Sequence, residues 1–193
     1  MSILVLTSDT LIGTPATGNL EYNGQFFGTD SNASRAQMQR ITQGTAVAST
    51  SGTSIDFTGL PAWVKRVTIN FQGVSTSGLN FVIVQLGTGS TTFTTSGYLG
   101  AVNSANSITN QTTGFGVIGQ PAAANVLHGT ATVTNLTGNT WCYAGTIYLS
   151  NTAGGGGGAG SISLGAALTA IRITTVGGTD TFDAGNINIL YEG

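Results

Sequence analysis

Short runs of alternating apolar and polar residues constrain this chain more than any other feature of its sequence. Val67, Ile69 and Phe71 occupy every second position of one run, and Thr, Asn and Gln fill the positions between and after them. A period of two residues is typical of a half-buried β-strand. Segment 81–86 is apolar almost throughout, which predicts a central strand covered on both faces. The patterning therefore predicts a protein built from strands.

Further strand-like segments follow to the end of the chain. They include 55–57, 141–149, 162–164, 171–173 and 187–191. About eight strands with almost no helical periodicity predict an all-β fold, an antiparallel jelly-roll-like β-sandwich. A membrane helix needs about 20 continuous apolar residues, and no segment approaches that length. We therefore expect no membrane insertion.

The chain carries very little charge. Only 6% of its 193 residues are charged, against about 25% in an ordinary soluble domain. Lys65, Arg66 and Arg172 are too few to form a basic patch, and the net charge is −2, so we expect no nucleic acid partner. Weak repulsion between copies is compatible with an oligomer. Cys142 is the only cysteine and cannot form an intrachain disulfide.

The first part of the chain differs from the rest and predicts a separate arm. Asn23-Gly24 lies between extended segments, which indicates a type I′ hairpin. Ser34–Ile41 is the one plausible helix, short and capped by Ser34. We expect an arm at 1–43 for attachment or oligomer contact, a linker at 44–52 and a β-sandwich domain at 53–193. Met1–Leu6 lacks a basic region and a cleavage site, so no signal peptide is expected.

Candidate chemical groups are scarce. His128 is the only histidine, and together with Cys142 it is too little for a zinc site. Trp141 begins a patterned strand, which favours core packing over stacking on a sugar. Gly154–Gly158 predicts a flexible loop and lacks the context of a phosphate-binding loop. We expect no catalytic residue and no cofactor.

Asp180 and Asp183 are the one close pair of carboxylates. They flank a turn, where Asp usually bonds to its own backbone, and this structural interpretation is favoured. Two alternatives remain open. Loop oxygens of this kind suit a calcium ion, so both residues are weak metal candidates. Two acids can also cleave a glycosidic bond.

Two parts of the sequence carry distinctive motifs. Residues 14–24 read TPATGNLEYNG, which is similar to an element of phage tail-fibre and virion proteins in which an Arg often follows, as Arg35 does here. Residues 55–68 read IDFTGLPAWVKRVT and residues 171–192 read IRITTVGGTDTFDAGNINILYE. These two segments resemble the ends of a module of phage and prophage proteins. The resemblance extends over nearly the whole main domain, with a variable middle.

The resemblance implies a surface protein of a phage particle, a tail fibre, head fibre or decoration protein, commonly a homotrimer. It would be assembled in the host bacterial cytoplasm. The arm would contact a neighbouring subunit or other virion proteins through Tyr22, Phe26, Phe27 and Arg35. An alternative is a receptor-binding module that recognises a host surface polysaccharide. A glycan-cleaving enzyme is a third hypothesis, supported in the sequence only by Asp180 and Asp183.

Overall fold

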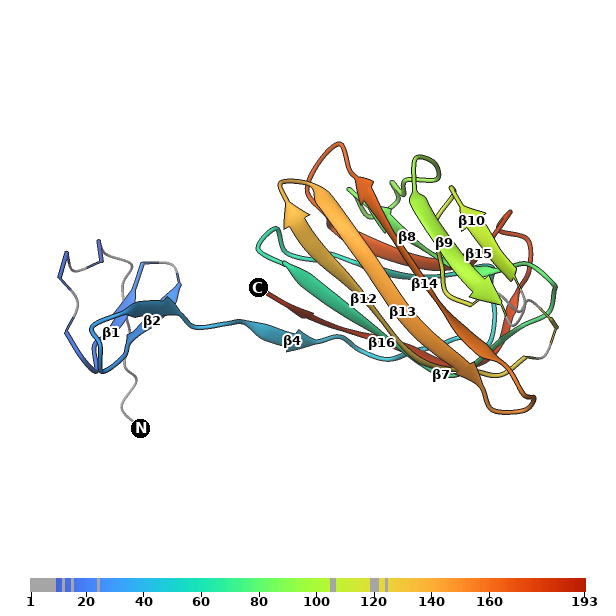
Figure 1. Cartoon of the computed structure of the whole chain (residues 1–193), viewed down its shortest axis with the longest axis horizontal. Coiled ribbons are helices and arrows are strands. Elements are labelled where there is room, and N and C mark those ends of the chain that lie inside the picture. The colour runs from blue at the N-terminus through green and yellow to red at the C-terminus, as the bar shows by residue number, and fades with distance from the viewer. Residues whose placement is uncertain are drawn as a thin grey trace. The chain divides into compact units, whose positions relative to one another are not determined.

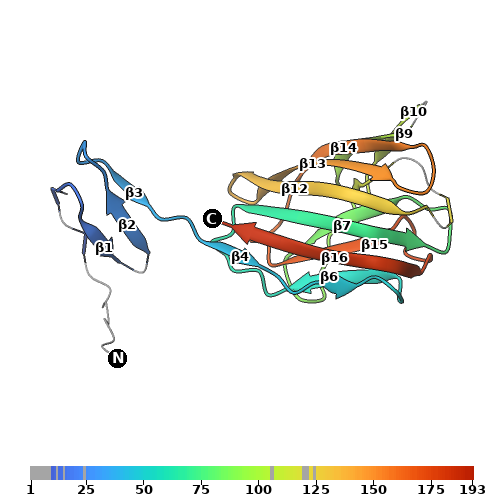
Figure 2. The same ribbon diagram turned by 90° about the horizontal axis from the view of Figure 1, so that it is seen from below.

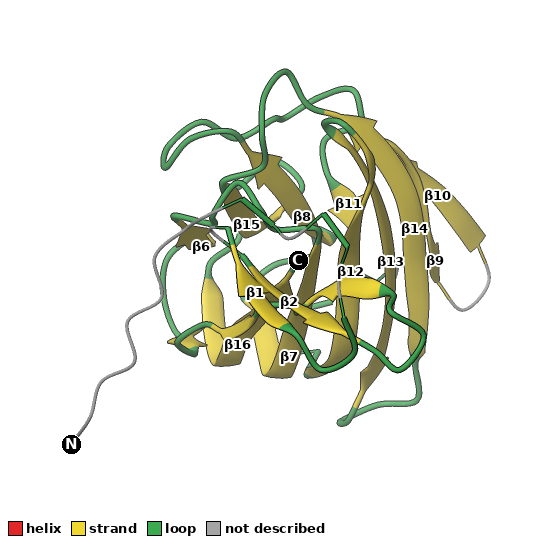
Figure 3. Ribbon diagram, turned by 90° about the vertical axis from the view of Figure 1, so that its left-hand side faces the viewer, coloured by secondary structure: helices red, strands yellow, loops and turns green. Residues whose placement is uncertain are grey.

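The computed structural model describes residues 10–11, 13–14, 16–23, 25–104, 107–118, 122–123 and 125–193. The chain divides into two compact units, Met1–Arg40 and Ile41–Gly193, called here the N-terminal unit and the sandwich unit. The described residues form strands, turns and loops and contain no helix (Figure 3). No helix in this part of the chain is therefore long and apolar enough to cross a membrane.

The N-terminal unit is built on one small antiparallel sheet, the N-terminal sheet. Its strands are β1 (Leu20–Tyr22), β2 (Phe26–Thr29) and β3 (Arg35–Gln37), in the order β1-β2-β3. Tyr22 pairs with Phe26, so the hairpin predicted around Asn23 is present. Gly24, on which the predicted turn type depends, lies outside the described residues.

The helix predicted at Ser34–Ile41 is wrong. The chain forms a turn at residues 30–34, because the Asp30 carboxylate accepts hydrogen bonds from the backbone amides of Asn32 and Ser34, both at 2.9 Å. Ala33 adopts a left-handed conformation with φ 57°. An Asp side chain that bonds to the following backbone favours a turn over a helix. The chain then leaves the turn as β3, which pairs with β2.

The sandwich unit contains two antiparallel sheets (Figures 1 and 2). The larger has the order β10-β9-β14-β13-β12-β7-β16-β4, with β5 also on β16, and the smaller has the order β11-β8-β15-β6. Their bounds are β4 (Ile41–Gln43), β5 (Val47–Ala48), β6 (Ser54–Thr58), β7 (Arg66–Thr76), β8 (Val82–Gly87), β9 (Leu99–Ser104), β10 (Ser107–Gln111), β11 (Phe115–Gly116), β12 (Leu127–Thr137), β13 (Thr140–Leu149), β14 (Gly155–Ser163), β15 (Ala170–Thr175) and β16 (Phe182–Glu192).

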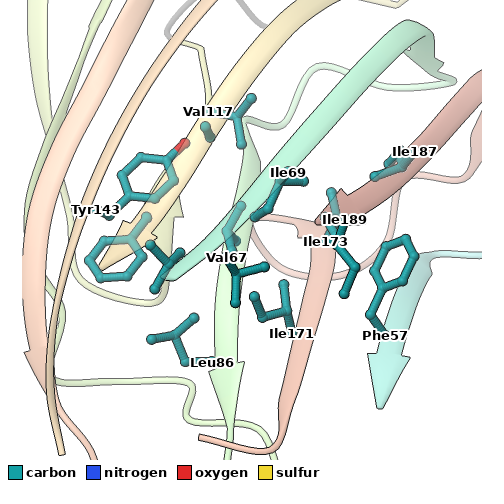
Figure 4. Close-up of a cluster of buried hydrophobic side chains, with 14 of the residues drawn as sticks. Phe57, Val67, Ile69, Leu86, Val117, Tyr143, Ile171, Ile173, Ile187 and Ile189 are labelled. Carbon is teal, nitrogen blue, oxygen red and sulfur yellow. The ribbon is translucent and has the colours of Figure 1, made fainter. Parts of the chain in front are cut away.

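One hydrophobic core lies between the two sheets, which confirms the predicted all-β sandwich. The inward residues of β7 and β16 meet those of β15 and β6, as Figure 4 shows for Ile69, Ile189, Ile173 and Phe57. Every residue of β8 is buried, as its continuous apolar run predicts. The strands outnumber the eight of a simple jelly roll, so that finer part of the expectation stays a prediction.

The segment expected to be a linker belongs to the sandwich unit. Val47 pairs with Ile187 of β16, and the buried side chain of Ser49 donates a hydrogen bond to the Ala184 carbonyl at 2.8 Å. Edge strands are held by backbone hydrogen bonds, so small polar residues are sufficient here. The boundary between the two units falls after Arg40, so residues 41–52 all belong to the sandwich unit.

The glycine run at 154–158 is not the flexible loop that its composition predicts. Gly155 begins β14, which pairs with β13 along its whole length. A Cβ atom on Gly158 would lie 2.0 Å from the Gly116 carbonyl oxygen of β11, in the opposite sheet. The glycines therefore let the two sheets approach backbone to backbone at this point.

Candidate functional site

Arg35, one of the four predicted contact residues, forms an ion pair within the N-terminal sheet. The Arg35 guanidinium donates hydrogen bonds to both carboxylate oxygens of Glu21, at 2.7 Å from Nε and 3.1 Å from Nη2. The Glu21 side chain is only 6% exposed. Arg35 was expected to contact a partner, and the structure places its guanidinium on Glu21 within the same sheet. Phe27 pairs with Glu21 across β1 and β2 and therefore shares this face.

The other face of the N-terminal sheet is apolar and open to solvent. Leu20, Phe26 and Met38 are 59%, 43% and 54% exposed. Together with Gln39 and Arg40 they line a groove of about 390 Å³. The Tyr22 ring packs on the Phe26 ring with centroids 4.9 Å apart. We call the surface formed by Leu20, Phe26 and Met38 the apolar face.

This unit buries almost none of its apolar side chains. Among its described residues only Glu21 and Thr29 are buried, and both are polar. Every buried apolar residue of the described chain lies between Ile55 and Ile189, in the sandwich unit. The large apolar side chains that the structure describes in the N-terminal unit therefore remain accessible to another molecule.

The two weak metal candidates have structural contacts instead. The Asp180 carboxylate accepts hydrogen bonds from the backbone amide and the side-chain amide of Asn80, both at 2.8 Å. Asp183 accepts a hydrogen bond from the Ser75 hydroxyl. Within the described residues, no group of three or more His, Cys, Asp or Glu side chains is arranged to hold a metal. Asp180 lies in the connection between β15 and β16, and its hydrogen bonds to Asn80 thus hold that connection against the loop at 77–80.

Two buried tyrosines line the interior near the glycine strand. The Tyr98 hydroxyl accepts a hydrogen bond from the Leu86 amide at 2.7 Å and donates to the Thr94 carbonyl at 3.0 Å. The Tyr143 hydroxyl is buried without a hydrogen-bond partner among the described residues. Burial raises the pKa of both hydroxyls, that of Tyr98 to about 12. Trp141 is buried in the same core, as predicted.

A cleft lies over the outer face of the smaller sheet. Arg172 of β15 donates two hydrogen bonds to Asp56 of β6, at 2.8 and 2.7 Å. The guanidinium carbon also lies 4.0 Å from the centroid of the Phe93 ring. An ion pair on one side and a ring on another hold the guanidinium in one position. The Asp56 pair also raises the pKa of Arg172.

The cleft has a volume of about 360 Å³, and six of its eleven lining residues are Ser or Thr. Beside Arg172, its polar lining includes Thr53, Ser54, Thr95, Thr113, Thr174 and Gln85. Gln85 is buried, and its side-chain nitrogen donates to the Thr113 carbonyl at 2.8 Å. Gly177 and Gly178, both with positive φ, form the turn at one wall. Arg172 is the only charged residue in the lining.

Sequence patterning alone could not find this cleft. Asp56 and Arg172 stand 116 positions apart, and both lie in alternating runs that predict strands without predicting which strands pair. The sequence pattern likewise does not single out Leu20 and Met38, since Met38 lies in the segment that predicts a helix. The alternation of Leu20 and Tyr22 around Glu21 was the available signal for the apolar face.

Comparisons with protein-family models, with curated proteins and with solved structures found no match to this chain.

Proposed function

We propose that this chain is a non-catalytic structural protein of a bacteriophage particle, attached through its N-terminal unit and displaying its sandwich unit as a fibre or decoration. The observation that supports this most is the apolar face. Leu20, Phe26 and Met38 lie together on one side of a sheet in which none of the described apolar side chains is buried. Another protein of the particle covers this face in the assembled state.

The N-terminal sheet is small. Three strands of three or four residues gain little stability unless a hydrophobic face is covered. Exposed apolar side chains that lie together mark contact sites in soluble proteins. The Glu21–Arg35 pair fixes the opposite side, so the sheet can present its apolar side as one surface.

The assignment to a phage particle rests on the resemblance of residues 14–24 and of the two segments of the main domain. Glu21 belongs to the first of these, and Arg35 is the downstream arginine. The ion pair between Glu21 and Arg35 is a structural reason for the presence of a downstream arginine in the N-terminal unit. The site of action would be the virion, assembled in the host cytoplasm.

A homotrimer is part of the same proposal. Light scattering on a sizing column should give a mass about three times the 19.4 kDa of one chain. A monomer at all concentrations would contradict the trimer, although attachment through the apolar face would stand.

Attachment is tested with substitutions that make the apolar face polar. We expect Leu20→Asn combined with Met38→Gln to reduce incorporation into particles about tenfold or more, since covering exposed apolar side chains drives association. The matched control is Leu79→Asn combined with Leu136→Asn, two residues of the sandwich unit that are 70% and 67% exposed. Equal incorporation of both variants and the unaltered chain would contradict the proposal.

A further inference from the structure

The cleft over the smaller sheet has the features of a ligand site rather than of a packing defect. Its floor is formed by side chains on paired strands, among them Gln85 and Thr174, which are 7% and 6% exposed. A volume of about 360 Å³ lies at the lower end of the range for small-molecule sites. A ligand of one or two rings would fill it.

The hydrogen-bonding groups of the cleft are incompletely used. The Gln85 nitrogen bonds to the Thr113 carbonyl, which leaves Gln85 Oε1 facing no donor in the described chain. Arg172 uses Nε and Nη2 on Asp56, which leaves Nη1 without an acceptor among the described residues. The cleft therefore contains one acceptor, Gln85 Oε1, and one donor, Arg172 Nη1. The nearby Ser and Thr hydroxyls can each donate or accept a hydrogen bond.

The charge of the cleft decides which ligand these groups suit. Arg172 is the only charged residue that lines it, and Asp56 neutralises that charge at 2.7 Å. A phosphate or a carboxylate would have to compete with Asp56 for the same guanidinium. A neutral ligand with several hydroxyls meets no such competition, because each hydroxyl both donates and accepts a hydrogen bond.

We propose that this cleft binds a neutral saccharide unit. Arg172 Nη1 donates to a sugar oxygen, Gln85 Oε1 accepts from a sugar hydroxyl, and the hydroxyls of Thr95 and Thr113 complete the contacts. Asp56 is a specificity residue, since it positions the guanidinium and cancels its charge. The site belongs to the sandwich unit and does not depend on how the N-terminal unit attaches.

The test is a titration of the full-length, isotope-labelled chain followed by amide NMR shifts. The probes are the methyl glycosides of glucose, galactose, mannose, rhamnose and N-acetylglucosamine at millimolar concentrations, with N-acetylneuraminic acid and inorganic phosphate as charged comparisons. We expect at least one neutral glycoside to shift the amides of Thr53, Thr95, Thr113 and Gly178. No binding by any neutral glycoside, shifts confined to other surfaces, or tighter binding of a charged probe would each overturn the proposal.

Substitutions then connect binding to the named groups. Thr113→Val and, on the exposed rim, Thr95→Val should each weaken binding of the neutral probe by about threefold to tenfold, the loss expected for one hydrogen bond. Thr130→Val, on the exposed outer face of the larger sheet, is the matched control and should leave binding unchanged. Asp56→Asn should bring N-acetylneuraminic acid into the cleft, because it leaves the Arg172 charge uncompensated. Unchanged binding in both cleft variants would overturn the proposal.

Discussion

The Arg35 guanidinium and the Glu21 carboxylate meet through two hydrogen bonds, although 14 positions separate them in the chain. The carboxylate is almost fully buried in a sheet that buries no apolar side chain among its described residues. A buried charge is tolerated only when it is paired. The fold of the N-terminal sheet therefore depends on this pair more than on hydrophobic packing.

Arg35→Gln should unfold the N-terminal sheet and leave the sandwich unit intact. Removing one partner of a buried ion pair costs about 3 kcal/mol or more, which exceeds what three short strands supply. Amide NMR peaks of residues 20–37 should lose their dispersion, whereas those of β16 should not move. Adding Glu21→Gln should recover part of the dispersion, because it removes the unpaired charge. A dispersed N-terminal sheet in Arg35→Gln would show that the pair is dispensable.

The two buried tyrosines should respond oppositely to loss of their hydroxyls. Tyr98→Phe leaves the buried Leu86 amide without its acceptor and should lower the free energy of unfolding by about 1–3 kcal/mol. Tyr143→Phe removes a buried hydroxyl that has no partner in the described chain, so it should leave stability equal or raise it. Urea denaturation of both variants checks this. Similar losses in the two variants would contradict the assigned contacts.

Stability should fall steeply at alkaline pH. Burial raises the pKa of Tyr98 to about 12 and raises that of Tyr143, whereas an unfolded tyrosine ionises near pH 10. Above pH 10 the unfolded chain therefore holds fewer protons than the native chain, and the free energy of unfolding decreases as pH rises. Each tyrosine should contribute about 1.4 kcal/mol per pH unit between pH 10 and 12. Tyr143→Phe should reduce that slope, and an equal slope would contradict the burial of its hydroxyl.

Gly158 should tolerate no side chain. A Cβ atom there would lie 2.0 Å from the Gly116 carbonyl oxygen, so Gly158→Ala must push the two sheets apart. We expect a loss of about 1–3 kcal/mol or more in the free energy of unfolding, as for other overpacked cores. Gly165→Ala is the matched control, since no atom lies within 4 Å of the position of its Cβ. A harmless Gly158→Ala would contradict the close approach of β14 and β11.

The sequence predicted those elements in which side-chain patterning determines the structure. The alternation at 67–72 and 141–149 and the apolar run at 81–86 each correspond to a strand, β7, β13 and β8. A period of two residues reports burial on one face directly, so these strands and their sandwich were predictable.

The errors fall where the structure depends on contacts that the pattern of apolar and polar residues does not report. The glycine run forms β14 because backbones from both sheets approach it, and glycine by itself carries no such signal. The expected helix at 34–41 gives way to a turn organised by Asp30 and to pairing of β3 with β2. The cleft could not be predicted for the same reason, because its residues come from β6, β8, β15 and the loops beside them.

We propose that another protein covers the apolar face in the particle. Hydrogen exchange can detect this contact, by comparing the amides of β1, β2 and β3 in the free chain with those in purified particles that carry the chain. We predict that these amides exchange at least about tenfold more slowly on the particle, while the amides of β16 exchange alike in both states. Equal exchange of the N-terminal sheet in the two states would contradict the account.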